Sequence, residues 1–363
     1  MYLALERTCY RITCDASALL TALPRGAYTT ARTHFSGRGV FEYSAHVSRT
    51  AASAAQMMLE EGFPVAGGAR CFTAAAALSP RLRASLLAAL GGALGSGGDG
   101  EWKLTVLLLW GARCAEARAA LAPLLAGAAG GGGGGGGALP GGDADGLLLT
   151  HAQRLAPRRP PPILVEAFGA PRASAAAKDS AWVAQRRGLE AARGAGVEEV
   201  LLVSEGGGAL EGLQTNFFAV DARGVVRTAG EGVLAGTVRG LVLDVCAREG
   251  VPVVMEAPSL EGASGWRGAF LTSTSRLLLP VDGLAWDGGS GGGGERATVA
   301  LGSRADPLVA RLEELVKGEV AARSEVLMPE GLPLDALGAL LASASDDELE
   351  ARIRQEALQA TMP

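Results

Sequence analysis

The chain has 363 residues, of which 48% are hydrophobic and 20% are charged, so it is long enough and apolar enough for two globular domains. The formal net charge of -5 at pH 7 argues against a nucleic-acid partner and against an anionic membrane surface as a partner. No apolar run approaches the length of a membrane span, so we expect no membrane-embedded segment.

The first residues and the cysteines indicate a compartment. The start, "MYLALERTCYRITCD", lacks the layout of a signal peptide, so we expect a cytoplasmic protein, or an organellar one if a transit peptide precedes Met1. Five cysteines are scattered with no CxxC pair, which is typical of a reducing compartment and excludes a recognisable zinc site. We therefore expect no bound metal.

The first half of the chain predicts a hairpin, a helix and a buried strand. Residues 26–43, "GAYTTARTHFSGRGVFEY", contain two β-rich runs on either side of a glycine-containing turn. A helix is predicted from about residue 46 to 61, because apolar residues recur there at helical spacing. Those residues are Val47, Ala51, Ala54 and Met58. The run "KLTVLLLW" (103–110) has the length and composition of a buried strand.

The second half alternates helical and extended patterns. Helices are predicted for 180–196 and, most clearly, for 237–250, where five apolar residues share one face and Gly250 ends the pattern. Those five are Val238, Leu241, Val242, Val245 and Cys246. Strands or hairpins are predicted at 197–204, 215–229, 251–257 and 268–281, and an amphipathic helix at 347–360. This mixture predicts an α+β fold.

Composition also indicates how the chain divides. Three tracts, at 91–100, 130–137 and 287–294, are too rich in glycine to pack a core and are predicted to be surface insertions. The stretch "APRRPPP" (156–162) is stiff and extended, which is typical of a linker. We predict a smaller N-terminal α/β domain at 1–155, a linker at 156–170, a larger C-terminal domain at 171–330 and a helical tail at 331–363.

Lysine is rare in this chain. Only three of the 33 basic residues are lysine, namely Lys103, Lys178 and Lys317. In a composition so biased toward arginine, a lysine is expected where the chemistry needs an amine that can lose its proton.

Five short motifs occur in an order that is typical of one family. They are "TTART", "SAHVSRT", "LEGLQTNFF", "VLAGTVRG" and "LTSTSRLLLPV". Together with Lys178, and over roughly 26–281, they resemble the fold-type IV (class IV) pyridoxal-phosphate enzymes. These are the branched-chain and D-amino acid aminotransferases and aminodeoxychorismate lyase. The resemblance implies their two-domain fold, with the larger C-terminal domain binding pyridoxal phosphate and the glycine-rich tracts as surface insertions.

The resemblance also implies a role for each motif residue. Lys178 is similar to the lysine whose amine forms a Schiff base with pyridoxal phosphate and later moves the substrate proton. Glu211 matches the glutamate that faces the pyridine nitrogen and keeps it protonated, so it would be buried and paired rather than a solvated turn acid. The phosphate would lie at a helix N-terminus and beside the guanidinium of an arginine, which can donate two hydrogen bonds at once. The implied phosphate contacts are Arg49, Thr237, Val238, Ser273 and Thr274.

Two departures from the family bear on cofactor and substrate. Relatives usually have Ile or Val and then Thr after the glycine of "VLAGTVRG", whereas this chain has Thr237 and then Val238. Where relatives have a carboxylate-binding arginine and a cofactor-binding tyrosine, this chain has Trp110 and Val183. The candidate substrate-side residues are Tyr28, Thr30, Arg32 and Trp110. The alternative for "YTTAR" is an ordinary alternating strand with two faces.

The leading functional hypothesis is a transaminase that passes an amino group from an amino acid to a 2-oxo acid through Lys178. The alternative is a lyase that eliminates pyruvate from aminodeoxychorismate to give 4-aminobenzoate, and the third hypothesis is a pyridoxal-phosphate-binding protein without significant turnover. The resemblance further implies a homodimer. The runs "KLTVLLLW" and "LVEAF" (164–168) support a dimer, since they are more apolar than a small domain could cover alone.

Overall fold

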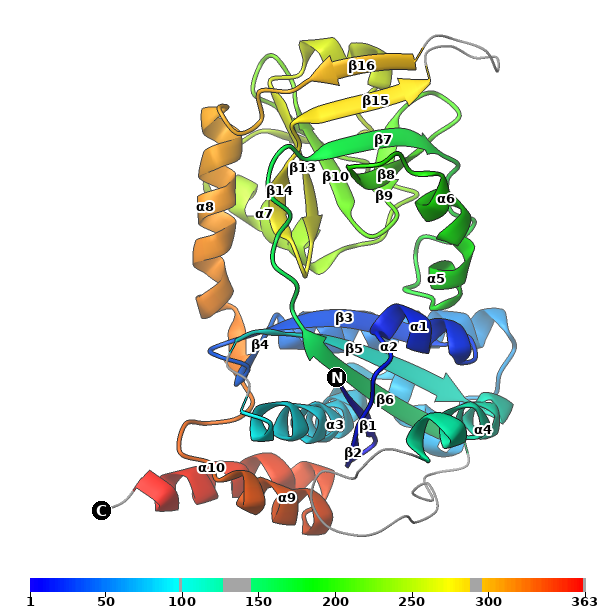
Figure 1. The fold of residues 1–363 in the computed structure, drawn as a ribbon, viewed down its shortest axis with the longest axis vertical. Helices are drawn as coiled ribbons and strands as arrows, with labels where there is room; N and C mark the ends of the chain where they lie inside the picture. The colour runs from blue at the N-terminus through cyan, green and yellow to red at the C-terminus, as the bar shows by residue number, and fades with distance from the viewer. Residues whose placement is uncertain (98–99, 127–144, 288–295, 362–363) are drawn as a thin grey trace. The chain divides into compact units, whose positions relative to one another are not determined.

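The computed structural model describes residues 1–97, 100–126, 145–287 and 296–361 (Figure 1). The run 130–137 and most of the tract 287–294 lie outside these residues. The described chain forms two compact units. Unit 1 comprises Met1–Leu155, Ala177–Ala184 and Arg323–Pro363, and unit 2 comprises Ala156–Ala176 and Gln185–Ala322.

Unit 1 is built on a seven-stranded sheet in the order β17-β4-β3-β5-β6-β1-β2. All its neighbouring strands run antiparallel. The strands are β1 (Tyr2–Leu5), β2 (Thr8–Arg11), β3 (Ala27–His34), β4 (Gly39–Phe41), β5 (Trp102–Trp110), β6 (Gly146–Arg154) and β17 (Ser324–Val326). The expected hairpin at 26–43 is therefore β3 and β4, and the expected buried strand at 103–110 is β5.

Helices cover both faces of this sheet (Figure 1). Residues alternate along β5, so that Leu104, Val106 and Leu108 join one core while Leu107 and Leu109 join the other. The helices of unit 1 are α1 (Ala16–Ala22), α2 (Tyr43–Glu60), α3 (Ala75–Gly95), α4 (Ala112–Leu125), α5 (Ala181–Gln185), α9 (Leu334–Ser343) and α10 (Asp346–Thr361), with a 3-10 helix at Gly67–Thr73.

The burial of β5 corrects one expectation. The run "KLTVLLLW" needs no second chain to cover it, because the apolar side chains of β5 are buried within unit 1 on both faces. The run "LVEAF" is only partly covered: Val165 and Ala167 are buried, whereas Leu164 and Phe168 are exposed. The apolar argument for a dimer is therefore wrong for β5.

The glycine-rich tract 91–100 is a second correction, because its first half is helical. Helix α3 continues to Gly95, and Ala93 is fully buried. A Cβ on Gly92 would lie 2.6 Å from the Cys9 sulfur and 3.0 Å from the Tyr2 ring. Glycine at this position therefore lets the helix pack closely against β1 and β2, which composition alone does not indicate.

The C-terminal helices belong to the core of unit 1. Leu337 and Leu340 of α9 and Leu349 and Ile353 of α10 are buried in the same cluster as α2 and α3. The sequence-based division treats 331–363 as a separate tail, and the compact units differ from it here. They also differ in assigning 177–184 to unit 1 and 156–176 to unit 2. Both differences arise from contacts between residues far apart in the chain, which composition does not reveal.

Unit 2 is built on a ten-stranded sheet in which β12-β11-β10-β9-β8-β7-β15-β16 form the main path and β13 joins β10 to β14. Its strands are β7 (Leu164–Gly169), β8 (Val197–Val203), β9 (Ala209–Gly212), β10 (Asn216–Val220), β11 (Val226–Arg227), β12 (Val253–Val254), β13 (Gly268–Ser273), β14 (Leu277–Pro280), β15 (Gly283–Asp287) and β16 (Arg296–Ala300). Its helices are α6 (Arg187–Ala192), α7 (Thr237–Arg248) and α8 (Pro307–Ala322), with a 3-10 helix at Leu260–Gly265.

Helix α7 agrees closely with its sequence pattern. All five residues of the predicted apolar face are buried, and the helix ends two residues before Gly250. The helix packs against α8 and β13, so its stripe faces the core of unit 2. With two sheets and helices in both units, the predicted α+β class is confirmed. Among the described helices, none is long and apolar enough to cross a membrane.

Candidate active site

Lys178 lies in a short non-helical segment that is held against β3. The Tyr28 N–H donates to the Lys178 carbonyl at 2.9 Å, and the Lys178 N–H donates to the Ser53 hydroxyl of α2 at 3.0 Å. Gly26 and Ser180 bond to each other through the Gly26 N–H and carbonyl, both at 2.9 Å. The backbone of this lysine is therefore fixed on both sides, while its side chain is only half-buried.

The Lys178 amine lies over an aromatic ring. Its Nζ is 4.6 Å from the centroid of Tyr28, whose side chain is buried on β3. The negative face of the ring attracts a protonated amine and limits where the Nζ can move. Tyr28, one of the four candidate substrate-side residues, thus contacts the lysine amine.

Arg49 of α2 lies beside polar side chains of α2 and β3 in unit 1. Its Nη2 donates to the Thr29 hydroxyl at 2.7 Å and lies 3.1 Å from His46 Nδ1, and the Thr29 hydroxyl is 2.9 Å from the same nitrogen. Burial, with the nearby charges of Arg49 and Lys178, holds the pKa of His46 well below 6.5, so the imidazole is neutral at pH 7. Because Nδ1 accepts from Arg49, we assign the ring proton to Nε2.

The surroundings of Arg49 disfavour its positive charge. Loss of hydration lowers the pKa of its guanidinium to about 10, and the Tyr28 hydroxyl acts in the opposite direction. Its side chain nevertheless keeps some contact with solvent. A bound anion would restore the electrostatic balance, since guanidinium pairs well with phosphate oxygens.

Trp110 is buried, and its indole contacts a network of charged side chains. Its Nε1 donates to Glu61 at 3.2 Å, and the Arg113 guanidinium lies 5.0 Å from a Trp110 ring centroid. Glu61 also pairs with Arg113 at 2.9 Å and with Arg25 at 3.1 Å, and Arg25 pairs with Asp179 at 2.7 Å. The network anchors the residue that follows Lys178. Arg113 therefore forms an ion pair with Glu61.

Thr30 and Arg32 follow Tyr28 at alternate positions of β3, so the three share one face of the strand. Both are half-buried, whereas Thr29 on the other face is buried against α2. A substrate role for Thr30, Arg32 and Trp110 remains a prediction. The alternating-strand interpretation of "YTTAR" describes the observed burial equally well.

Glu211 is a buried acid on β9 of unit 2. Its Oε2 accepts the Leu234 N–H at 2.9 Å and the Asn216 side-chain amide at 3.4 Å. Its Oε1 lies 2.6 Å from Nη2 of Arg172, whose side chain is also buried. Only 3% of Glu211 is exposed, so the carboxylate is not a solvated turn acid. It organises the loop that leads into α7.

The N-terminus of α7 depends on a close approach at Gly236. A Cβ at this position would lie 2.1 Å from Oδ1 of Asn216, whose amide nitrogen donates to the Leu234 carbonyl at 2.8 Å. Helix α7 begins at Thr237, and its first-turn amides and dipole favour an anion. The Val238 side chain is in the core, so only its amide is suited to contact a phosphate, while Thr237 is half-buried.

We expect Gly236→Ala to destabilise unit 2 by about 1–3 kcal/mol, because the new methyl group would push Asn216 away from Leu234 and Glu211. Gly240→Ala is the matched control in the same helix, since a Cβ there meets open space and alanine favours helix by about 0.5–1 kcal/mol. Urea unfolding of both variants measures the difference. Equal stability of the two variants would show that the contact at Gly236 is unimportant.

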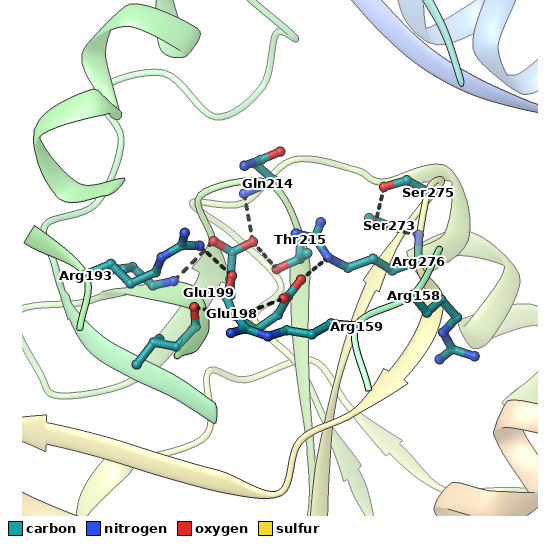
Figure 2. A network of polar contacts seen from close by, with 12 residues as sticks. Arg158, Arg159, Arg193, Glu198, Glu199, Gln214, Thr215, Ser273, Ser275 and Arg276 are labelled. Carbon is teal, nitrogen blue, oxygen red and sulfur yellow. Dashed lines mark hydrogen bonds and ion pairs between the residues drawn. The ribbon is translucent and has the colours of Figure 1, made fainter. Parts of the chain in front are cut away.

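A polar network runs from Gln214 and Thr215, which follow β9, to Arg276 and Ser273 at the turn between β13 and β14 (Figure 2). Glu199 accepts from the Gln214 N–H at 3.3 Å and from the Thr215 hydroxyl at 3.2 Å. Burial raises the pKa of the Glu199 carboxyl, against the lowering effect of Arg276. The neighbouring acid, Glu198, accepts from Arg276 Nε at 2.6 Å.

The Ser273 hydroxyl is used within its own turn. It accepts from the Arg276 N–H at 3.2 Å and lies 3.4 Å from the Ser275 hydroxyl (Figure 2). Thr274 lies in the turn between β13 and β14 and is half-buried. The segment expected to be a strand at 268–281 is thus a hairpin of β13 and β14, and Ser273 and Thr274 lie at its turn.

Sequence reasoning missed Arg172 and the roles of Asn216 and His46. Asn216 belongs to the "LEGLQTNFF" motif and His46 to "SAHVSRT". Both motifs indicated the family, but they predicted no contact for these two residues. Arg172 belongs to none of the five motifs. It lies in the irregular stretch "APRASAAA", and only the fold places it against Glu211.

Each unit, taken by itself, carries groups of the kind that pyridoxal phosphate needs. Unit 1 offers an amine at Lys178 and a guanidinium at Arg49 whose surroundings favour an anion. Unit 2 offers the buried carboxylate of Glu211 and a helix N-terminus at Thr237. An aldehyde, a phosphate and a ring nitrogen need donors of these types. The chain belongs to the amino-transferase class IV family, whose model matches residues 81–284, more than half of its length.

Solved structures share this fold at low sequence identity. A branched-chain aminotransferase from the archaeon Thermoproteus uzoniensis, solved with norvaline, is 16% identical with a TM-score of 0.58, and the match covers 91% of this chain and 97% of that one. A branched-chain amino acid aminotransferase from Escherichia coli is 18% identical with a TM-score of 0.55, over 89% and 95% of the two chains. An aminotransferase described as hypothetical from Mycobacterium tuberculosis is 16% identical with a TM-score of 0.58, over 89% and 99%. Curated proteins gave no match.

Membership of the family establishes the activity class. The chain is a pyridoxal-phosphate-dependent transaminase, and its substrates are amino acids and 2-oxo acids. The predicted fold type and cofactor are confirmed, and transamination is favoured over the lyase alternative. The family match begins after Arg49, so the assignment of Arg49 depends on its surroundings in unit 1.

Proposed function

We propose that this transaminase moves an amino group from an amino acid to a 2-oxo acid with Lys178 as its catalytic residue. The observation that supports this best is the fixed position of Lys178, whose backbone is bonded to Tyr28 and Ser53 while its amine lies over the Tyr28 ring. Bound pyridoxal phosphate supplies an electron sink next to the Cα–H bond of the substrate. The Lys178 amine then accepts and returns the Cα proton.

The other residues bind and tune the cofactor. We assign to Glu211 the hydrogen bond to the pyridine nitrogen, because a buried carboxylate favours the protonated form of a nearby base. Arg49 would bind the phosphate by charge, with the first-turn amides of Thr237 and Val238 and the hydroxyls of Ser273 and Thr274 as further donors. The exchange of Thr and Val after Gly236 leaves the amides in place and changes only the side chains.

The lyase alternative and the cofactor-binding protein without turnover predict different kinetics. A transaminase in the presence of an amino acid converts its cofactor to the amine form once and then stops until a 2-oxo acid is added. A lyase turns over without any amino acceptor, and an inactive binding protein changes neither spectrum nor substrate.

We expect a panel of L- and D-amino acids to shift the visible absorbance of the cofactor-loaded enzyme toward the amine form of the cofactor, with a 2-oxo acid restoring it. The donor that gives the fastest shift identifies the substrate. Turnover of aminodeoxychorismate to 4-aminobenzoate without a 2-oxo acid, or no shift with any donor, would contradict the proposal.

We also propose a homodimer. The resemblance supports it, and so does the exposure of Leu164 and Phe168 on β7. Sedimentation at micromolar concentration tests this, and an active monomer would refute it. For the compartment we propose a reducing one such as the cytoplasm, because all five cysteines are free thiols.

A further inference from the structure

Arg172 occupies the side of Glu211 that the proposed function reserves for the cofactor. Oε2 of the carboxylate is engaged by the Leu234 N–H and the Asn216 amide, which hold the loop before α7. Oε1 is 2.6 Å from Arg172 Nη2. A ring nitrogen that donates to Glu211 without disturbing the loop must therefore do so at Oε1.

Two cations would compete for this oxygen. The protonated ring nitrogen and the guanidinium are both positively charged, and like charges held within a few ångströms in a buried site repel each other strongly. The side chains of Glu211 and Arg172 are only 4% and 7% exposed, so water screens this repulsion poorly.

We propose that Arg172 is the counter-ion of Glu211 in the cofactor-free protein and that the ring nitrogen of the cofactor displaces it. This inference rests on the proposed role of Glu211. The ion pair keeps the buried carboxylate compensated until the cofactor arrives, since a buried charge without a partner is costly. Breaking the pair then opposes binding, so Arg172 sets how tightly the cofactor is held.

Glu211 retains a second positive neighbour when Arg172 is removed. Arg239 of α7 is buried and donates to the Ala229 carbonyl at 2.7 Å. Burial lowers the pKa of Arg239, and the charge of Glu211 acts in the opposite direction, which places the two groups within electrostatic reach. A variant without Arg172 is therefore expected to fold.

The test compares Arg172→Met with wild type by titrating pyridoxal phosphate into the apoprotein. We expect Arg172→Met to bind the cofactor roughly tenfold more tightly, with a lower melting temperature for the apoprotein and an unchanged one for the loaded protein. The matched control is Arg267→Met, which removes an arginine of the same unit that pairs with the buried Asp306 at 2.7 Å. It should leave the dissociation constant within about twofold.

Two further variants separate the possible outcomes. Arg172→Lys keeps the charge and should bind the cofactor as wild type does. In a Glu211→Gln background, Arg172→Met should no longer tighten binding, because the attraction it relieves is gone. An unchanged or weaker affinity of Arg172→Met would overturn the inference alone. If wild type binds no cofactor at Lys178, the proposed function itself fails.

Discussion

Replacing Lys178 with alanine should lower the rate of amino-group transfer by roughly 10³-fold or more, because the variant loses both the amine that holds the cofactor and the base that moves the Cα proton. The fold should survive, since the side chain is half-buried and its truncation leaves the bonds of the Lys178 backbone to Tyr28 and Ser53 intact. Initial rates with an amino acid and a 2-oxo acid measure the loss. Borohydride reduction of the wild type should attach the cofactor to Lys178.

Lys317→Ala is the matched control. This lysine lies on α8, is well exposed, and pairs with Glu313 at 3.1 Å and Glu314 at 3.0 Å. Exposed pairs of this kind contribute about 0.3–0.5 kcal/mol, so its loss should leave both stability and turnover close to wild type. Peptide mapping that found the reduced cofactor on Lys103 or Lys317 would refute the assignment of Lys178.

Glu211→Gln should keep the cofactor bound but lower turnover by roughly 10²-fold, because a neutral amide cannot hold the ring nitrogen in its protonated form. The glutamine oxygen can still accept the Leu234 N–H, so the loop before α7 should remain in place. The measurement is turnover at saturating cofactor, together with the visible spectrum of the loaded variant.

Glu166→Gln provides the control for Glu211→Gln. Glu166 is also a buried acid of unit 2, accepts the Gly194 N–H at 2.9 Å and pairs with Arg296. The substitution removes a comparable buried charge that has no part in the proposed chemistry. Turnover should stay within about twofold of wild type once folding is matched. If both glutamine variants lose turnover equally, Glu211 has only a structural role.

The spacing of apolar residues in the sequence correctly predicted individual helices and strands. The apolar face of α7, the buried strand β5 and the amphipathic α10 all follow from the spacing of apolar residues, which is set by the geometry of helix and strand. The motif with Glu211 was also informative. The Asn216 amide donates to its acid, and both side chains bond to Leu234 of the same loop, so their spacing reflects one local structure.

Long-range contacts were beyond the sequence patterns. Composition indicated that 91–100 could not pack, yet Gly92 supports close packing against β1 and β2. The apolar run in β5 was interpreted as a surface that needs a partner, because nothing local reveals that helices cover both faces of its sheet. Arg172 could not be found either, since its meaning depends on a residue 39 positions away.

The path of the chain constrains the order in which the protein can fold during synthesis. All of unit 2 has been translated once Ala322 is made, whereas unit 1 still lacks β17, α9 and α10 at that stage. Until those last residues emerge, the apolar surface that Leu337, Leu340 and Ile353 cover in the finished unit is open to water and to other chains. Unit 1, whose synthesis starts first, is thus completed after unit 2. A nascent or truncated chain that ends near residue 322 would have a finished second unit and an aggregation-prone first one.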